Sequence, residues 1–168
     1  MKLIPLTLQH APDLLEFELY NRTWFEQHIE PRPDDFYSLI GVQTHSAELL
    51  MDKTLGKGVP ALLINQQGDI IGRVNLANIA KGKAFLGYRL AEKYVGRGIA
   101  KQAVGMMLEL AKQKSIQKVV ALTSVENIAS QKVLKSHGFV EKSKLRNFTC
   151  VQGVNKDCLE FRLDLDSN

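Results

Sequence analysis

Three short β-strand patterns lead directly into a long helical pattern, and this succession constrains the fold more than any other feature of the chain. We predict strands over 59–65, 70–79 and 84–90, separated by two glycine-containing turns. Residues 98–114 instead place apolar side chains at helical spacing, over a stripe wide enough for a largely buried helix. Because strands joined by such short turns pair in antiparallel order, we expect an antiparallel meander followed by a buried helix.

The elements predicted on either side of this segment set the fold class. The other predicted strands cover 2–6, 118–123, 139–151 and 158–165, and the other predicted helices cover 7–22, 34–53 and 129–137. The expected apolar face of the first helix is Leu14, Leu15, Phe17 and Leu19. Residues 21–33 are expected to form a loop with aromatic anchors, and Gly41 is a point at which the second helix could break. The order β-α-α-β-β-β-α-β-α-β-β indicates an α/β or α+β fold with a mixed sheet.

Length and composition exclude several classes of protein. The 168 residues suit one domain with a substantial core, so we expect a single domain over 1–168. A hydrophobic share of 45% with 24% charged residues is typical of a globular chain, and no apolar run approaches the roughly 20 residues of a membrane span. Two cysteines do not make a disulfide scaffold, and the N-terminus lacks the apolar stretch of a signal peptide. We therefore expect a cytoplasmic protein.

The net charge of +4 comes from scattered side chains, and most of them are expected to be solvated. No recognition helix or basic stripe with interleaved aromatic residues is present, so no nucleic-acid partner is expected. The four histidines have no metal-ligand spacing, so no metal is expected either.

The loop before the long helix could bind a phosphate group. Gly96 and Gly98 give its backbone freedom, and the first N–H groups of the helix lack intrahelical partners. Together with the helix dipole these groups favour phosphate oxygens, and Arg97 could add a charged contact. The pattern is neither a dinucleotide fingerprint, because position 101 is Lys, nor a Walker A loop. Taken alone, Gly-Arg-Gly fits a structural turn as well as it fits a phosphate site.

A second group of polar residues surrounds the start of the helix predicted over 129–137. Asn127 stands just before this helix, and Ser130 lies in its first turn. Gly138 and Phe139 follow its end. A purely structural interpretation is available, in which Asn127 caps the helix, Gly138 ends it and Phe139 enters the core.

The two segments, in this order and at this separation, resemble the GNAT superfamily of acetyl-CoA-dependent N-acetyltransferases. The loop pattern of that family, [Q/R]-x-x-G-x-[G/A], is similar to residues 93–98, with Lys93 at the position of Gln or Arg. Its later N-x-x-[S/A] motif and Gly-Phe pair match Asn127, Ser130, Gly138 and Phe139. Within the superfamily the chain looks most like the RimJ/RimL branch of ribosomal-protein N-terminal acetyltransferases, through 21–22, 24–25, 31–33, 70–72 and 86–88.

The resemblance implies a mostly antiparallel sheet of about seven strands, flanked by about four helices. The sheet would splay into a V between the strand ending at Leu90 and the strand ending near Thr123, and acetyl-CoA would lie in that cleft. Its pantetheine amides would pair with the backbone around Leu90, and its pyrophosphate would rest on the amides of 96–100. The cofactor-binding residues that the resemblance implies are Arg89, Leu90, Ala91, Val95, Gly96, Arg97, Gly98, Ile99, Ala100, Asn127, Ser130 and Lys132.

The chemistry requires a deprotonated amine, a stabilised oxyanion and a proton for the departing thiolate. Many relatives use a Tyr as the acid where this chain has Leu134, so the resemblance makes Ser130 the candidate to protonate or position the sulfur. Asn127 would hold the pantetheine arm or a water molecule. No base is evident; Glu126 is the nearest acid, although it could simply support the helix. The candidate acceptor-binding residues are Trp24, Phe25, Arg32 and Tyr88.

We therefore expect an N-acetyltransferase that transfers the acetyl group directly to the N-terminal α-amine of a protein, such as a ribosomal protein. Direct transfer fits a site without a Cys or Ser nucleophile backed by a His base. Two alternatives stay open: a small acceptor such as a polyamine, amino acid or aminoglycoside, or a non-catalytic sensor that binds acyl-CoA. Pairing of edge strands in a homodimer also stays open.

Overall fold

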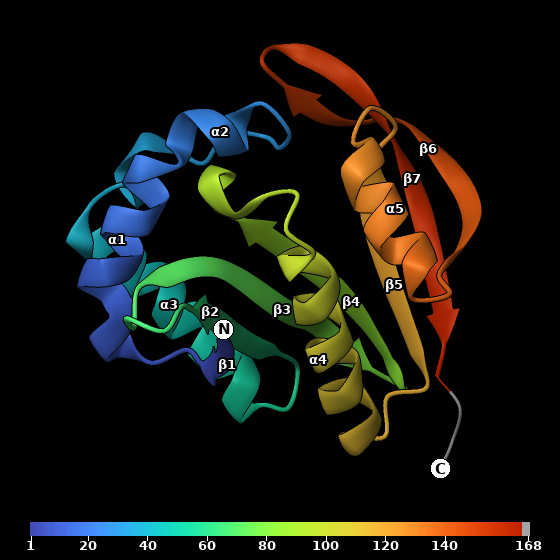
Figure 1. The fold of residues 1–168 in the computed structure, drawn as a ribbon, viewed down its shortest axis with the longest axis horizontal. Helices are drawn as coiled ribbons and strands as arrows, with labels where there is room; N and C mark the ends of the chain where they lie inside the picture. The colour runs from blue at the N-terminus through green and yellow to red at the C-terminus, as the bar shows by residue number, and fades with distance from the viewer. Residues whose placement is uncertain (166–168) are drawn as a thin grey trace.

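A single seven-stranded sheet forms the centre of the protein in the computed structural model, which describes residues 1–165 (Figure 1). The strands are β1 (Lys2–Pro5), β2 (Val59–Ile64), β3 (Ile70–Ala80), β4 (Lys83–Leu90), β5 (Lys118–Ser124), β6 (Val140–Val151) and β7 (Val154–Asp164). They lie in the order β1-β2-β3-β4-β5-β7-β6, and every neighbouring pair except β4 and β5 is antiparallel. The predicted mixed, mostly antiparallel sheet is confirmed.

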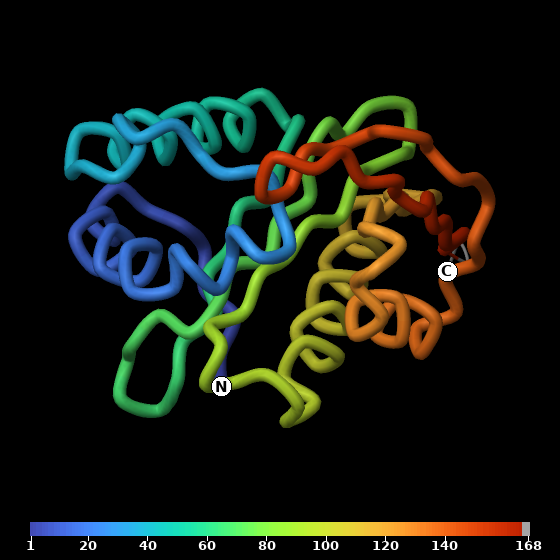
Figure 2. Tube along the Cα trace, turned by 90° about the horizontal axis from the view of Figure 1, so that it is seen from above, coloured from blue at the N-terminus to red at the C-terminus, as the bar shows by residue number. Residues whose placement is uncertain are grey.

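Helices cover both faces of this sheet (Figure 2). They are α1 (Ala11–Tyr20), α2 (Arg22–Glu26), α3 (Leu39–Thr54), α4 (Ile99–Gln113) and α5 (Ile128–Ser136), with 3-10 turns η1 (Leu8–His10), η2 (Asp34–Phe36) and η3 (Glu92–Tyr94). The helices α1 and α3 lie on one face, and α4 and α5 lie on the other. Among the described residues, four helices have seven or more residues, as expected.

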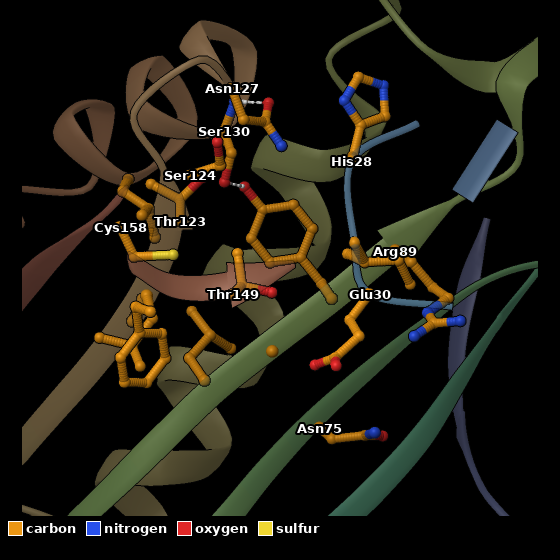
Figure 3. Close-up of a pocket in the computed structure, with 18 of the residues that line it drawn as sticks. His28, Glu30, Asn75, Arg89, Thr123, Ser124, Asn127, Ser130, Thr149 and Cys158 are labelled. Atoms are coloured by element: carbon orange, nitrogen blue, oxygen red, sulfur yellow. Dashed lines mark hydrogen bonds between the residues drawn. The ribbon is translucent and has the colours of Figure 1, made fainter. Parts of the chain in front are cut away.

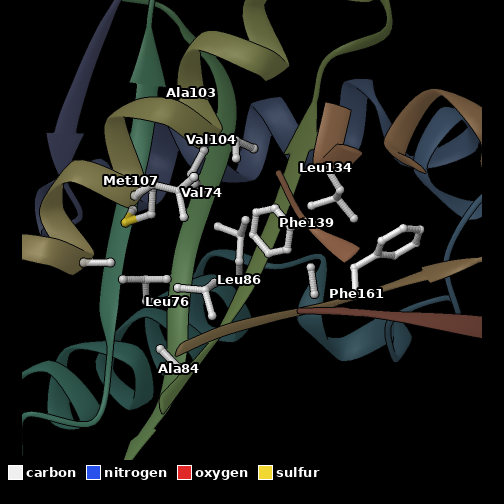
Figure 4. Close-up of a cluster of buried hydrophobic side chains, with 14 of the residues drawn as sticks. Val74, Leu76, Ala84, Leu86, Ala103, Val104, Met107, Leu134, Phe139 and Phe161 are labelled. Carbon is white, nitrogen blue, oxygen red and sulfur yellow. The ribbon is translucent and has the colours of Figure 1, made fainter. Parts of the chain in front are cut away.

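Two hydrophobic cores hold these layers together. The larger core joins the sheet to α4 and α5 through residues such as Leu86, Met107 and Leu134 (Figure 4). The smaller core joins α1, α2 and α3 to the opposite face through Phe17, Phe25, Val42 and their neighbours. Side chains alternate between the two faces of a strand, so each strand contributes to both layers.

The sheet opens between β4 and β5. These two strands pair only where Lys83–Phe85 meets Lys118–Val120, so β4 beyond Phe85 has no neighbouring strand on that side among residues 1–165. On its other side β4 stays paired with β3 up to Leu90, and the N–H of Ala91 donates to the carbonyl of Ile71 at 2.9 Å. Because hydrogen-bonded positions alternate in an antiparallel pair, the N–H and C=O groups of Tyr88 and Leu90 point into the opening. The expected V-shaped splay is confirmed.

The structure corrects two expectations near the N-terminus. Residues 21–33 are not only a loop, because α2 carries Trp24 and Phe25; five residues are too few to show a helical period. Gly41 lies inside α3 and does not break it; Ser38 caps this helix by accepting a hydrogen bond from the Gly41 N–H at 3.0 Å. A Cβ on Gly41 would lie 2.1 Å from the Asp35 carbonyl oxygen, so glycine is needed there for close packing of η2.

Three elements begin several residues away from their predicted starts. The helix expected over 34–53 is α3, which begins at Leu39 because the turn η2 and the cap at Ser38 precede it. The first helix begins at Ala11 after the turn η1, and Leu19 is 49% exposed, because the buried side of α1 runs through Leu14, Phe17 and Glu18. Strand β7 begins at Val154, four residues earlier than predicted. A two-residue turn with positive φ at Gln152 and Gly153 joins it directly to β6.

Candidate functional site

A cavity of about 370 Å³ lies where β4 and β5 separate (Figure 3). Its lining comes from both of these strands, the start of α5, the β6–β7 hairpin and the segment that follows α2. Asn127, Ser130 and Thr123 occupy one side of the close-up, and Arg89, Glu30 and His28 occupy the other. The cavity therefore connects groups from the two faces of the sheet.

Ser130 and Tyr88 form a hydrogen-bonded pair of hydroxyl groups at this cavity. The side-chain oxygen of Asn127 accepts a hydrogen bond from the Ser130 N–H at 3.1 Å, which caps α5 and fixes the place of Ser130. The Tyr88 Oη lies 2.9 Å from the Ser130 Oγ. Burial raises the pKa of Tyr88 although the bond to Ser130 opposes this, so the phenol is protonated at neutral pH. One of the two hydroxyl protons remains available to a ligand.

The structure does not bring Glu126 together with these groups. Its carboxylate is exposed and lies 2.8 Å from the ammonium group of Lys156, and Glu126 is not part of the cavity lining. Lys132 is also exposed and outside the lining. The geometry therefore gives no support to Glu126 as the base.

The loop before α4 presents unpaired backbone donors. Gly98 is the N-cap of α4 with φ +73°, Gly96 has φ +77°, and no side chain caps the helix. The first intrahelical bond runs from the Gln102 N–H to the Gly98 carbonyl, so the earlier N–H groups of α4 have no helical partner. A Cβ on either glycine would meet nothing within 4 Å, so glycine is needed for the left-handed backbone. The exposed Val95 and Arg97 lie in the same loop.

Of the four predicted acceptor residues, the structure brings Arg32 and Tyr88 to the cavity. Trp24 and Phe25 are not in its lining. Trp24 donates its Nε1–H to the Leu90 carbonyl at 3.2 Å, and Phe25 is a core residue 5.6 Å from the Phe17 ring. These aromatic side chains support the end of β4.

A group of charged side chains, not predicted from the sequence, forms part of the cavity wall and the layer below it. Arg73 and Arg89 are opposite each other on β3 and β4, and both face Glu18 on α1. The Glu18 carboxylate is fully buried and lies 2.7 Å from the Arg73 Nη1 and 3.1 Å from the Arg89 Nη1. Burial alone would raise the pKa of Glu18, but Arg89 and Arg73 hold it below its ordinary value.

His45 completes this group, with its Nε2 3.3 Å from the Arg73 Nη2. Burial lowers the pKa of His45 to about 4, with a further contribution from Arg73, so the ring is neutral at pH 7. The sequence does contain a signal for the group. Arg73 and Arg89 fall within predicted strands, and Glu18 follows the buried Leu14 by one helical turn.

No helix within residues 1–165 is long and apolar enough to cross a membrane. Within the same range, no three His, Cys, Asp or Glu side chains gather as a metal-binding group.

Known proteins share both the sequence pattern and the fold. The sequence model of the acetyltransferase (GNAT) domain family matches residues 1–140. The chain is 28% identical over 161 residues to the probable N-acetyltransferase YjcK of Bacillus subtilis (strain 168), and the match covers 91% of this chain and 87% of YjcK.

Solved structures extend the comparison to the fold. The ribosomal-protein-S5-alanine acetyltransferase from Vibrio fischeri has a TM-score of 0.93 and 21% identity, over 98% of this chain and 92% of that one. RimJ of Mycobacterium smegmatis in complex with CoA-disulfide has a TM-score of 0.88 and 22% identity, over 96% of this chain and 80% of that one. A structural neighbour thus binds CoA on the same fold.

Proposed function

Because this chain belongs to the GNAT acetyltransferase family, we propose that it transfers the acetyl group of acetyl-CoA directly to the N-terminal α-amine of a protein. The observation that carries the proposal is the cavity at the splay, where the free edge of β4 meets the Tyr88–Ser130 pair. The resemblance to the RimJ/RimL branch and the high TM-score to a ribosomal-protein acetyltransferase support a protein acceptor.

The register of β4 narrows the predicted contacts to the pantetheine arm. The N–H of Ala91 is already bonded to Ile71, and the backbone of Arg89 faces β3. The N–H and C=O groups of Tyr88 and the N–H of Leu90 face the opening instead, so they are the better candidates to pair with pantetheine amides, whereas the Leu90 carbonyl already accepts a hydrogen bond from Trp24. The Leu90 N–H would also be placed to polarise the thioester carbonyl, and the amides of 96–100 would hold the pyrophosphate.

Ser130 and Tyr88 would serve the departing sulfur. Acetyl-CoA supplies a thioester, whose C–S bond breaks after the amine nitrogen bonds to the carbonyl carbon. The Ser130 hydroxyl would donate a proton to the sulfur, and Tyr88 would replace that proton through the 2.9 Å hydrogen bond. The phenol would then regain a proton from solvent, which also receives the proton lost by the amine. This pair of hydroxyl groups would thus act as the acid in place of the tyrosine that many relatives have where this chain has Leu134. His28 and Glu30 line the opposite wall of the cavity, and we propose that one of them accepts the amine proton and releases it to solvent.

The test is an acetylation assay with a mixed panel of acceptors, read by mass spectrometry. The panel holds peptides with free Ser, Ala or Met N-termini, spermidine and an aminoglycoside. Acetylation of a peptide α-amine is expected, whereas acetylation of the small amines alone would overturn the proposed acceptor. Ser130→Ala should slow the transfer, and Ser136→Ala is the matched control because Ser136 is exposed at the far end of α5.

A further inference from the structure

Three guanidinium groups line the cavity: those of Arg32, Arg73 and Arg89. Among residues 1–165, Glu18 is the one carboxylate that forms ion pairs with any of them. We propose that the acceptor carries a carboxylate close to its reacting amine and that Arg32, beside Arg89, binds this carboxylate. The inference rests on the proposed function, since it describes the acceptor of the same reaction.

Of these three arginines, Arg32 is the one that forms no ion pair within residues 1–165. Its Nε is buried with no hydrogen-bond partner in that range. Its guanidinium carbon lies 4.3 Å from the centre of the Phe36 ring, which positions the group without neutralising it. Burial lowers the pKa of Arg32 to about 10, with Arg89 adding to this effect, so the group is still charged at pH 7. Arg32 is half-buried and its Nε is cut off from water, so a charge held there without a partner is costly, and an anionic ligand would supply that partner.

The position of the arginines assigns this anion to the acceptor and not to acetyl-CoA. Along β4, Tyr88 points towards α5, whereas Arg89 points to the opposite face and contacts Glu18 on α1. The backbone donors that suit the pyrophosphate of CoA precede α4, on the face occupied by Tyr88. Gly87 is two residues before Arg89 and so shares its face of β4, where an added Cβ would meet nothing within 4 Å.

The other charged residue of the cavity favours a ligand that carries both a positive and a negative charge. Glu30 lines the same cavity, is exposed, and forms no ion pair in the described part of the chain. It is therefore available to attract the ammonium group of the acceptor while Arg32 takes the carboxylate. A polyamine or an aminoglycoside carries only positive charges and would offer Arg32 no anionic partner, since Glu18 already pairs with Arg73 and Arg89. The carboxylate could belong to an acidic side chain near a protein N-terminus or to a free amino acid.

The experiment compares acceptors that differ in a single charge. Peptides beginning Ser-Glu and Ser-Asp are measured against Ser-Gln and Ser-Asn, and free amino acids against their α-amides. For the wild type we expect kcat/KM to be about 10- to 100-fold higher with the carboxylate, the usual range for a charge-assisted hydrogen bond. A preference confined to free amino acids would keep the carboxylate site but overturn the protein acceptor. Equal rates for each pair would overturn the carboxylate site alone.

Variants tie the preference to Arg32. Arg32→Gln should reduce the carboxylate preference to less than about threefold by slowing only the acidic acceptors, since a neutral acceptor makes no ion pair there. Arg146→Gln, an exposed arginine on β6, is the control and should keep the full preference. Calorimetric binding of the same peptide pairs in the presence of CoA gives a readout without turnover. Equal binding of acidic and amide peptides would refute the proposal, and so would an unchanged preference in a folded Arg32→Gln protein.

Discussion

Glu18→Gln removes the carboxylate that neutralises Arg73 and Arg89 in the cavity wall. Glu18 is 0% exposed and Arg73 is 3% exposed, with 2.7 Å between the Glu18 Oε1 and the Arg73 Nη1. The second pair, to Arg89, is longer at 3.1 Å and its arginine is 22% exposed, so it contributes less. Removing one partner of a buried pair costs about 3–5 kcal/mol because the other charge stays buried. We expect that loss in the free energy of unfolding, a large part of the roughly 5–15 kcal/mol of a typical domain.

Urea denaturation of the wild type and of Glu18→Gln, followed by circular dichroism at pH 7, measures this difference. The pKa of Glu18 is lowered in the folded protein, so its contribution is complete above its ordinary value of 4.5 and disappears as the pH falls through the folded value. The gap between the two proteins should therefore narrow in acid. The matched control is Glu109→Gln, which breaks an exposed pair with Lys112 and should cost less than about 1 kcal/mol.

A loss of less than about 1 kcal/mol for Glu18→Gln at pH 7 would refute the reasoning, because a buried charge left without its partner cannot be so inexpensive. A gap that widened in acid would refute it as well. That result would mean that the folded protein holds the Glu18 proton more tightly than the unfolded chain does.

Three further predictions concern the acetyl-CoA side of the cavity. Ser130→Ala and Tyr88→Phe should each lower kcat by about 100-fold. The double variant should lose little more, because the two hydroxyls act as one proton path, and steady-state kinetics of the four proteins of this mutant cycle test it. Gly98→Ala should weaken CoA binding in calorimetry, because its φ of +73° disfavours a side chain, whereas Gly56→Ala, with φ +72° in open space far from the cavity lining, should leave binding unchanged. Trp24→Phe loses the hydrogen bond to the end of β4 and should lower stability by about 1 kcal/mol and raise the KM for acetyl-CoA; an unchanged KM would contradict the supporting role.

Local patterns predicted the middle of the fold well. The strands β2, β3 and β4 and the helix α4 lie within one residue of their predicted bounds, because each has a hydrophobic period that its own residues determine. The helix α2 was missed because its five residues are helical in contact with α1 and β4, which a local pattern does not contain. Leu19 was assigned to the wrong side of α1 because the buried side includes the charged Glu18.

In the candidate site, too, local sequence patterns predict some parts, whereas other parts depend on how distant segments pack together. The loop around Gly98 and the Asn127–Ser130 turn are short segments whose residues act through neighbouring backbone, so the sequence indicates them directly. The pairing of Glu18 with Arg73 and Arg89 joins residues 55 and 71 positions apart. Only the register of β3 against β4 and the packing of α1 on their face create it.

The three-residue pairing of β4 with β5 has a consequence for how the protein holds together. The sheet consists of two halves, β1 to β4 and β5 to β7, that pair over three residues only. The larger core, to which α4 contributes, packs against both halves and holds them together. Few backbone hydrogen bonds therefore join the two halves of the sheet, and buried side-chain contacts do most of the holding. A substrate arm that lies along the open edge of β4 would fill the gap between β4 and β5 and form hydrogen bonds there. Binding of this arm would therefore raise the free energy of unfolding of the protein, and it would do so more for a ligand that binds more tightly.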